Sequence, residues 1–449
     1  MKNNLSINNF IIYSIYFFPI SILVGPFFIN LNLILCSLLF LVFFIANKKI
    51  KNFLSPELIL LFSFILYNIF SDLILERPNS YKSVSLLRFF LFGLCVNFYF
   101  SNNLINTLKY QKYLLFIIFL VCIDASIQYF FGANIVGIKK EPNYVSSFFG
   151  DEKILGSYIS KIIIFSLPFL IMKINLKKIF LLFFILFIIL QTTERIGLFI
   201  FLVSILTFLF FSNYTLKRKI IVCLISLSIL SMPLILYEKL RVNYLYKTFH
   251  QFGFENLNKK IILLVNDKKI FSHCEKIKIT KTLCAEQRYE NIKKQLGLHD
   301  LKLQKNIGIF SQNHIAHILV GIKIWQNSKF FGIGVSNFRH ASWGDEYQLE
   351  NELLNKLKAS THPHNLYIQI LTETGLIGFI LFFLSIVIII FKKIKNFVNK
   401  KENFEQYFAF FVILIIFLLP IPTGNIFGTS HGVFFWTYLL MNINLKKVK

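Results

Sequence analysis

Charged residues, and acidic ones above all, are scarce in this sequence of 449 residues. Only 16% of the residues are charged, against about a quarter in soluble globular domains, and 55% are hydrophobic. Lys and Arg number 48 and Asp and Glu 22, which leaves a formal net charge of +26. In a soluble chain that excess would indicate nucleic-acid binding, but apolar runs of roughly 18–20 residues recur from end to end. The composition therefore predicts a polytopic membrane protein that binds no nucleic acid.

The first apolar run lacks the features of a cleavable signal peptide. It extends from Phe10 to Ile29, which is too long for the hydrophobic region of a signal, and no small-x-small cleavage site lies near its end. We expect this run to be a first membrane span that also targets the chain. The sequence also contains no low-complexity tail and no detectable internal repeat.

The apolar runs predict about twelve membrane-spanning helices and hence an all-α fold. The predicted spans are 10–29, 30–46, 57–75, 84–100, 113–131, 155–173, 179–194, 196–211, 220–237, 366–391, 405–420 and 430–442. They divide the chain into nine helices in 1–237, a mainly helical loop domain in 238–365 and three helices in 366–449. Pro19 and Pro26 fall inside the first span, where neighbouring helices are expected to satisfy the freed backbone groups.

Lysine-rich connections indicate which side of the membrane each loop occupies. With the N-terminus inside, every cytoplasmic connection carries Lys, and most carry little or no acid, as the positive-inside rule requires. These connections are 47–52, 101–112, 173–178, 212–219, 392–403 and the C-terminal LKKVK. The loop domain, with helix-like stretches such as 286–306, is then expected on the outer side of the membrane.

All nine histidines lie on this predicted outer side. They are His250, His273, His299, His314, His317, His340, His362 and His364 in the loop domain and His431 in the last outer connection. One interpretation is that polar side chains are excluded from the spans and that this loop is the largest polar stretch. The other is proton-transfer chemistry at the outer face, for which imidazole is suited.

The cysteines give little information about function. Cys36, Cys95, Cys122 and Cys223 lie in apolar spans, where cysteine serves as a small hydrophobic residue. Cys274 and Cys284 are the only pair in the outer loop, where an oxidising compartment permits a disulfide. The sequence leaves open whether these two are bonded.

The segment 361–383, THPHNLYIQILTETGLIGFILFF, combines histidines with a pair of glycines. His362 and His364 stand just before a span and therefore at the outer membrane surface. They either cap the span, bind a metal or carry out chemistry, and no Asp or Cys nearby supports the metal. Gly375 and Gly378 lie three residues apart in the apolar helix, which permits close helix packing.

Three charged residues stand at or inside apolar runs, where an unpaired charge is costly. Arg195 lies at the outer turn between two spans. It either pairs with Glu194 or lipid phosphate, or binds the phosphates of an anionic donor bidentately. Arg88 and Asp124 are predicted to pair across neighbouring helices, in a role that is either structural or catalytic, and the structural role is favoured.

Two further segments carry weaker signals. Gly332 and Gly334 in FFGIGVSNFRH form a tight turn before Arg339, but no strand or dinucleotide fold accompanies this Gly-x-Gly pattern. Asp151 and Glu152 in FFGDEKILGSY stand at the outer start of a span, as an N-cap and a first-turn acid.

These motifs together resemble the O-antigen ligase and O-antigen polymerase superfamily of bacterial membrane glycosyltransferases. The most diagnostic pattern of that family is His followed by Asn, Ser or Gln, then nine residues and Gly-x-x-Gly. His364, Asn365, Gly375 and Gly378 match it without a gap. The Gly-x-Gly turn at 332–334, the segment FFGDEKILGSY and one large outer loop among about twelve spans are similar to the family as well.

The resemblance implies a GT-C-like enzyme that transfers an undecaprenyl-pyrophosphate-linked oligosaccharide at the periplasmic face. It implies a catalytic base at His364 and an outer-edge Arg195 that engages the donor pyrophosphate. The family's second arginine falls at His314, so either His314 serves this contact when protonated or Arg339 substitutes. Substrate contacts are expected from His362, Asn365, Arg339, Gly332, Gly334, Asp151, Glu152 and Arg88.

The expected reaction needs no cofactor and no metal. The acceptor hydroxyl requires a base within hydrogen-bond reach, and a pyrophosphate leaves readily once its charge is stabilised. We therefore expect an inverting displacement at the anomeric carbon. The acceptor is lipid A-core for a ligase or another lipid-linked repeat unit for a polymerase, and the sequence does not separate the two.

Two alternatives belong to other classes of protein. A transporter or flippase of lipid-linked sugars would concentrate charges near the membrane midplane, where this sequence holds little beyond Asp124 and Arg88. The other alternative is a membrane assembly protein without catalysis.

Overall fold

The computed structural model describes residues 2–46, 55–171, 175–212, 311–399 and 424–443, with a few isolated positions between these ranges. This part of the chain is helical, and its only bridge pairs Ala133 with Lys139. The predicted spans 220–237 and 405–420 fall almost entirely outside the described residues. The predicted stretch 286–306 and the cysteine pair at 274 and 284 lie outside them as well.

Six helical stretches in the described part are long and apolar enough to cross a membrane. They are α1 (Lys2–Val24), α2 (Pro26–Ala46), α3 (Pro56–Ile74), α4 and α5 together (Tyr81–Val84 and Leu86–Ser101), α6 (Thr107–Phe131) and α18 (Leu366–Val398). Large apolar side chains such as Phe27, Phe131 and Phe391 remain exposed on them, as lipid-facing side chains do. The chain is therefore a multi-pass membrane protein.

Four shorter apolar helices coincide with further predicted spans. They are α7 (Leu155–Ile171), α8 (Leu176–Gln191), α9 (Arg195–Phe211) and α20 (Thr429–Met441). Each has fewer residues than the roughly 20 that a straight span needs. The total of about twelve spans stays a prediction.

The boundary between the first two helices differs from the predicted one. α1 ends at Val24, Gly25 adopts a φ of 128°, and α2 begins at Pro26. Proline fits the first position of a helix because that residue needs no backbone N–H there. The prediction of one helix over 10–29 is therefore wrong by five residues, and Pro26 starts a helix instead of interrupting one.

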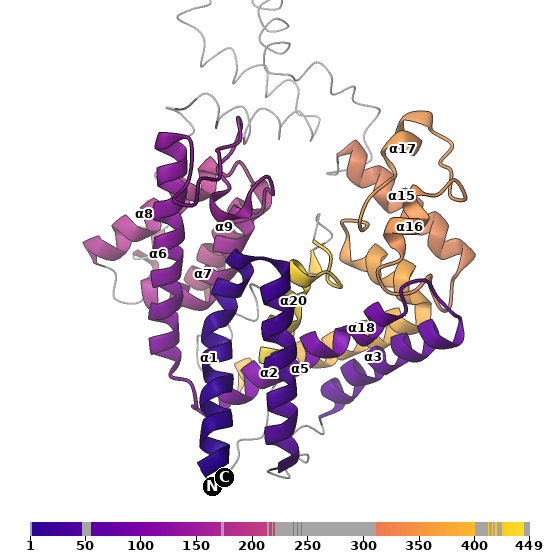
Figure 1. Cartoon of the computed structure of the whole chain (residues 1–449), viewed down its shortest axis with the longest axis horizontal. Helices are drawn as coiled ribbons and strands as arrows, with labels where there is room; N and C mark the ends of the chain where they lie inside the picture. The colour runs from indigo at the N-terminus through magenta and orange to yellow at the C-terminus, as the bar shows by residue number, and fades with distance from the viewer. Residues whose placement is uncertain are drawn as a thin grey trace, which may run out of the picture. The chain divides into compact units, whose positions relative to one another are not determined.

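The helices pack in groups that draw on distant parts of the sequence (Figure 1). α1 and α2 pack together, and α2 and α20 both pack on α5. α7 packs against α6, α8 and α9, and α18 runs alongside α3. The C-terminal helices α18 and α20 thus complete a bundle that the N-terminal half begins.

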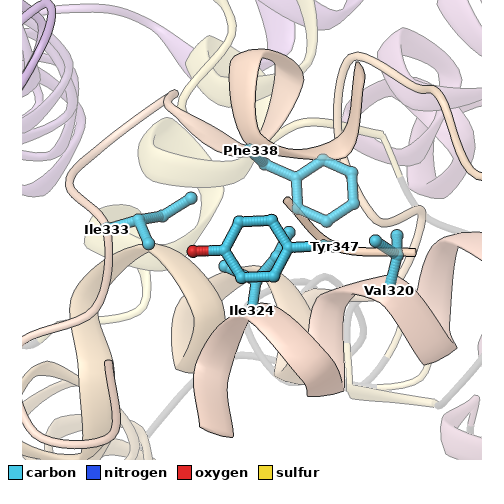
Figure 2. Packing of buried hydrophobic residues seen from close by; sticks show 5 residues of the cluster. All are labelled: Val320, Ile324, Ile333, Phe338 and Tyr347. Atoms are coloured by element: carbon cyan, nitrogen blue, oxygen red, sulfur yellow. The ribbon is translucent and has the colours of Figure 1, made fainter. Parts of the chain in front are cut away.

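Three helices precede α18 in the chain: α15 (Gln312–Asn327), α16 (Phe338–Trp343) and α17 (Glu352–Leu357). Their core is shown in Figure 2, where Val320 and Ile324 of α15 pack against Ile333, Phe338 and Tyr347. Val320, Ile324 and Phe338 are fully buried. This apolar core fixes which face of α15 is turned inward. The histidines near the N-terminus of α15 lie along the same face.

Asp124 holds the segment that connects α6 to α7. Its carboxylate accepts hydrogen bonds from Ser147 Oγ at 2.5 Å, Ile135 N at 3.0 Å and Asn134 Nδ2 at 3.2 Å. The predicted pair with Arg88 is therefore wrong, because backbone and side-chain donors of the connecting segment satisfy Asp124 instead. The structural role that we expected for Asp124 is nevertheless the one that it has.

Candidate functional site

α15 and α18 cross where a glycine lets their backbones approach. A Cβ atom on Gly321 would lie 2.5 Å from Ile368 Cγ2, and Thr372 Oγ1 donates to the Gly321 carbonyl oxygen at 3.2 Å. His317 lies one turn before Gly321, and His364 lies four residues before Ile368. The crossing therefore brings the first turns of α15 to the residues that begin α18.

Four histidines meet at this crossing: His314 and His317 from α15, and His362 and His364 from the segment before α18. The ring centroid of His364 lies 3.9 Å from that of His362 and 5.2 Å from those of His314 and His317. The His317 and His364 planes differ by 27°, so these rings stack. We call these four residues the histidine cluster. In the described part of the chain, no three His, Cys, Asp or Glu side chains are grouped as metal ligands would be.

Burial and mutual repulsion keep three members of the histidine cluster, His314, His317 and His364, uncharged. Desolvation lowers the pKa of His364 to about 2, and the neighbouring His362, His314 and His317 contribute to the lowering. Desolvation, followed by His314 and His362, lowers the pKa of His317 to about 4. Burial also lowers the pKa of His314. These three imidazoles are therefore neutral at neutral pH, and each can accept a proton.

The backbone around His364 is fixed tightly. His364 has a φ of 55°, in the left-handed region that few non-glycine residues adopt. Asn365 follows as the N-cap of α18, and its Oδ1 accepts from Ile368 N at 3.1 Å. Thr361 Oγ1 lies 2.9 Å from His362 Nδ1. The start of α18 thus sets the direction of both histidines.

The two glycine motifs of the sequence lie against each other. Gly375 interrupts α18 with φ 67° and ψ −172°, a conformation essentially confined to glycine. The Glu373 carbonyl oxygen accepts from Gly334 N at 2.9 Å, and a Cβ on Gly332 would lie 2.5 Å from Gly375 N. The expectation that Gly375 serves packing inside a continuous helix is corrected: it breaks the helix so that the Gly-x-Gly turn can dock there.

Two buried carboxylates hold the same turn. Glu373 of α18 accepts from Ser336 N at 2.9 Å and from Phe338 N, the first residue of α16, at 3.3 Å. Asp72 of α3 accepts from Val335 N at 3.3 Å. Our sequence analysis did not identify either residue, although an acid inside an apolar run was an available signal. Both serve the backbone of the turn.

Arg195 begins α9 at a turn that is fixed against α7. Glu194, the N-cap residue, is buried and accepts from Ser157 N through its Oε2 at 2.8 Å. A Cβ on Gly197 would lie 2.5 Å from the carbonyl carbon of Gly156, so α7 and α9 touch backbone to backbone. The half-buried Arg195 therefore stands on a rigid junction.

The remaining predicted residues have partners of their own. Arg88 donates through Nη2 to Thr429 Oγ1, at the start of α20, at 3.4 Å. Arg339 is exposed on α16, with its guanidinium 5.3 Å from the centroid of the Trp343 ring.

Asp151 and Glu152 are exposed in the segment before α7. The predicted roles of N-cap and first-turn acid are wrong for both. α7 begins only at Leu155 and has no acid in its first turn.

Sequence analysis missed a buried lysine. Lys161 of α7 is 8% exposed, and its Nζ lies 3.0 Å from His431 Nδ1 of α20. Tyr438 donates to the Lys161 carbonyl oxygen at 2.6 Å. His431 in turn interacts electrostatically with His362 of the cluster. A lysine inside a predicted span was the signal that could have identified this site.

Comparison with known proteins relates this chain to the O-antigen ligases. Residues 180–383 match the O-antigen ligase family, a segment that holds Arg195, the histidine cluster and both glycine motifs up to Gly378. A Rickettsia conorii protein that carries the name polysaccharide ligase is 30% identical over 115 residues. That alignment covers 26% of this chain and 27% of the relative. The predicted resemblance to the O-antigen ligase superfamily is confirmed.

Proposed function

We propose that this relative of the O-antigen ligases is a membrane glycosyltransferase. It would transfer a glycan from undecaprenyl pyrophosphate to lipid A-core at the periplasmic face of the inner membrane. The observation that carries the proposal is the histidine cluster at the start of α18, in which His314, His317 and His364 are neutral, inside the segment that matches the family. His364, which holds the position of the family's base, has an unprotonated imidazole there.

In the proposed reaction the acceptor hydroxyl attacks the anomeric carbon of the donor sugar. The new glycosidic bond forms as the hydroxyl proton passes to the His364 imidazole. The bond from the anomeric carbon to the pyrophosphate oxygen breaks, and its electron pair leaves with undecaprenyl pyrophosphate. The configuration at the anomeric carbon inverts.

Donor binding would adjust the strength of this base. A pKa of about 2 makes His364 a weak base in the free protein. A bound pyrophosphate brings negative charge, which raises the pKa of nearby imidazoles. Once the pyrophosphate has left, repulsion among the four rings would return the proton to solvent.

The other residues receive supporting roles in the proposal. Arg195 would bind the donor phosphates bidentately, and His314 and His362 would orient the substrates beside His364. Arg88 and Arg339 are proposed as further contacts to phosphate or sugar. Asn365 and the turn at 332–334 would act by holding the histidine cluster in place. Asp151 and Glu152, exposed before α7, are proposed as acceptors for sugar hydroxyls.

The test of the base is His364→Ala in the purified full chain, with a lipid-linked glycan donor and lipid A-core. We expect transfer to fall by about 100-fold or more, because general base catalysis contributes on that scale. The matched control is His340→Ala, which removes an exposed histidine of α16 and should leave transfer unchanged. Wild-type transfer by His364→Ala would refute the assignment.

Lipopolysaccharide from a deletion strain separates ligase from polymerase. A ligase is expected to leave long polymer on the carrier lipid and none on the core. A polymerase would instead leave single repeat units attached to the core. Transfer that collapses in EDTA and returns with a divalent ion would contradict the metal-independent mechanism.

A further inference from the structure

Neither residue first predicted to supply the second positive charge for a donor pyrophosphate is a buried cation in the free protein. Burial lowers the pKa of His314, so its imidazole is neutral at neutral pH. Arg339 is exposed and stacked on Trp343. A cation elsewhere in the compact unit formed by residues 1–219 and 312–449 has to be considered.

Lys161 is a buried cation whose hydrogen-bonding capacity is only partly used. Its Nζ carries three N–H donors, and one of them faces His431 Nδ1 at 3.0 Å. Among the described residues, the Nζ has no second acceptor and no carboxylate within ion-pair distance. Burying an ammonium group without a close counter-charge is costly. The Nζ also lies 5.5 Å from the centroid of the Phe434 ring, and two of its N–H donors remain for an anion.

The charges around Lys161 add to a positive field. Glu194 is the carboxylate that interacts electrostatically with Lys161, and it also interacts with Lys153. The Glu194 Oε2 is engaged by Ser157 N at 2.8 Å, and Arg195 follows Glu194 in the chain. One buried carboxylate therefore faces two lysines, and a further cation follows it in the chain. The acids at 151 and 152 are exposed, so solvent screens them.

Contacts link Lys161 both to the turn at Arg195 and to the histidine cluster. Ser157, one helical turn before Lys161 on α7, binds Glu194 at the start of α9. On the other side, His431 contacts Lys161 and interacts with His362 of the histidine cluster. Lys161 is thus connected to the Arg195 turn and to the cluster.

We propose that Lys161, oriented by His431, binds the phosphates of the lipid-linked donor as a second cation alongside Arg195. The proposal rests on the proposed function, because the ligand is the donor's pyrophosphate. A lysine ammonium binds phosphate oxygens as a compact point charge with rotatable donors. His431 takes one of these donors and leaves two for phosphate oxygens.

The experiment measures the affinity of undecaprenyl pyrophosphate for the purified full chain in detergent. Lys161→Met keeps the length of the side chain and removes its charge, and we expect it to weaken binding roughly tenfold. Lys161→Arg restores the charge and should recover most of the affinity. The matched control is Lys139→Met, at an exposed lysine of the segment between α6 and α7, which should bind as the wild type does.

The outcomes separate this inference from the proposed function. If the wild type binds undecaprenyl pyrophosphate and Lys161→Met binds equally well, Lys161 is not a phosphate ligand, while the proposed function stands. If the wild type binds none, the proposed donor itself is refuted.

A second measurement on the wild type covers the case in which the substituted chains do not fold. Acetylation of Lys161 by acetic anhydride, followed by mass spectrometry, should slow several-fold in undecaprenyl pyrophosphate and remain unchanged in undecaprenol. Equal rates in both lipids would overturn the proposal.

Discussion

The chemistry of the histidines depends on their surroundings more than on their residue type. His340 is exposed on α16, whereas His317 and His364 are stacked and desolvated, with pKa values lowered to about 4 and about 2. Like-charge repulsion adds to desolvation, so a second proton in the cluster is less favourable than the first. The protonation of His317 and of His364 therefore depends on the charge of the neighbouring rings.

The pH dependence of stability follows from these lowered values. An unfolded histidine takes up its proton near pH 6.5, while folded His317 does so only near pH 4. Between these values the unfolded state binds more protons, so stability falls as the pH falls from about 6.5 to 4. His317 alone should account for about 3 kcal/mol of this loss.

Thermal unfolding of the purified chain between pH 8 and pH 4 measures this effect. The apparent melting temperature should be flat above about pH 7 and fall below it. His317→Gln should flatten the decline, and His340→Gln, at the exposed histidine, should not. An equally steep decline in His317→Gln would show that the cluster does not control acid stability.

Arg195→Lys tests whether bidentate geometry matters at the start of α9. The substitution keeps the charge but replaces a planar fork by a point donor, so transfer should fall at least about tenfold. Steady-state transfer at varied donor concentration measures the change. Full activity would mean that Arg195 only reaches toward lipid phosphate.

For single residues, the sequence was sufficient to predict part of the candidate site. His314, His362, His364 and Arg195 were identified because the family pattern and their positions beside apolar runs mark them. Lys161 and Glu373 were missed, since each sits in an apolar run whose partners are far away in the sequence. Their partners, His431 and the backbone at 336–338, become neighbours only in the folded chain.

At the level of secondary structure, the α15–α18 crossing assembles the histidine cluster. Two histidines come from each side, and the approach depends on a single glycine. The apolar core of Figure 2 anchors the other end of the same helix face through Val320 and Ile324. The distance between the two helices therefore controls the site.

Gly321→Ala should separate the two helices. The added Cβ would lie 2.5 Å from Ile368 Cγ2, and overpacking of this kind costs about 1–3 kcal/mol. We expect a lower melting temperature and reduced transfer. Gly344→Ala is the matched control, because the nearest atom to its Cβ would be 3.6 Å away.

The Ile368→Ala background provides a second arm of this test. Removing the Ile368 side chain beyond Cβ makes room, so Gly321→Ala should cost less there than in the wild type. Equal costs in the two backgrounds would show that this contact does not limit the approach of α15 to α18.

The break in α18 shows where sequence periodicity is insufficient. Residues 366–391 form a continuous apolar run, which predicts one regular helix, yet Gly375 leaves the helical region. The segment 329–334 replaces hydrogen bonds that the broken helix loses: Ile333 N and Gly334 N donate to the carbonyl oxygens of residues 372 and 373, and the carbonyl oxygens of residues 329 and 330 accept from residues 376 and 377. The two glycine motifs could be found separately in the sequence, but nothing in either motif indicates that they touch.

For the whole molecule, lipid is the solvent that explains the composition. Backbone groups in lipid must be satisfied within the helix, and this requirement selects helices made of long apolar runs. Exposed phenylalanines on these helices face lipid without cost. The connections predicted to be cytoplasmic carry lysine and little acid, so they hold much of the net charge of +26, and the positive-inside rule assigns this charge to orientation.

Fusions to alkaline phosphatase test this orientation. A fusion at Asn79, in the loop between α3 and α4, should be active because the enzyme works only in the periplasm. A fusion at Asn103, between α5 and α6, should be inactive, since 101–112 is a predicted cytoplasmic connection. Phosphatase activity of the fusion at Asn103 would contradict the predicted topology. The histidine cluster would then lie on the wrong side of the membrane for a periplasmic donor.

The sequence by itself determined the class of protein, most of the helices and the resemblance to the O-antigen ligases, because hydropathy and local motifs can be read along the chain. The tertiary structure decided which residues meet. It brought His317 to His364, Lys161 to His431 and Gly332 to Gly375, and it kept Asp124 from Arg88. These outcomes depend on helix crossings and on the cost of leaving buried polar groups unpaired, which only the folded chain resolves.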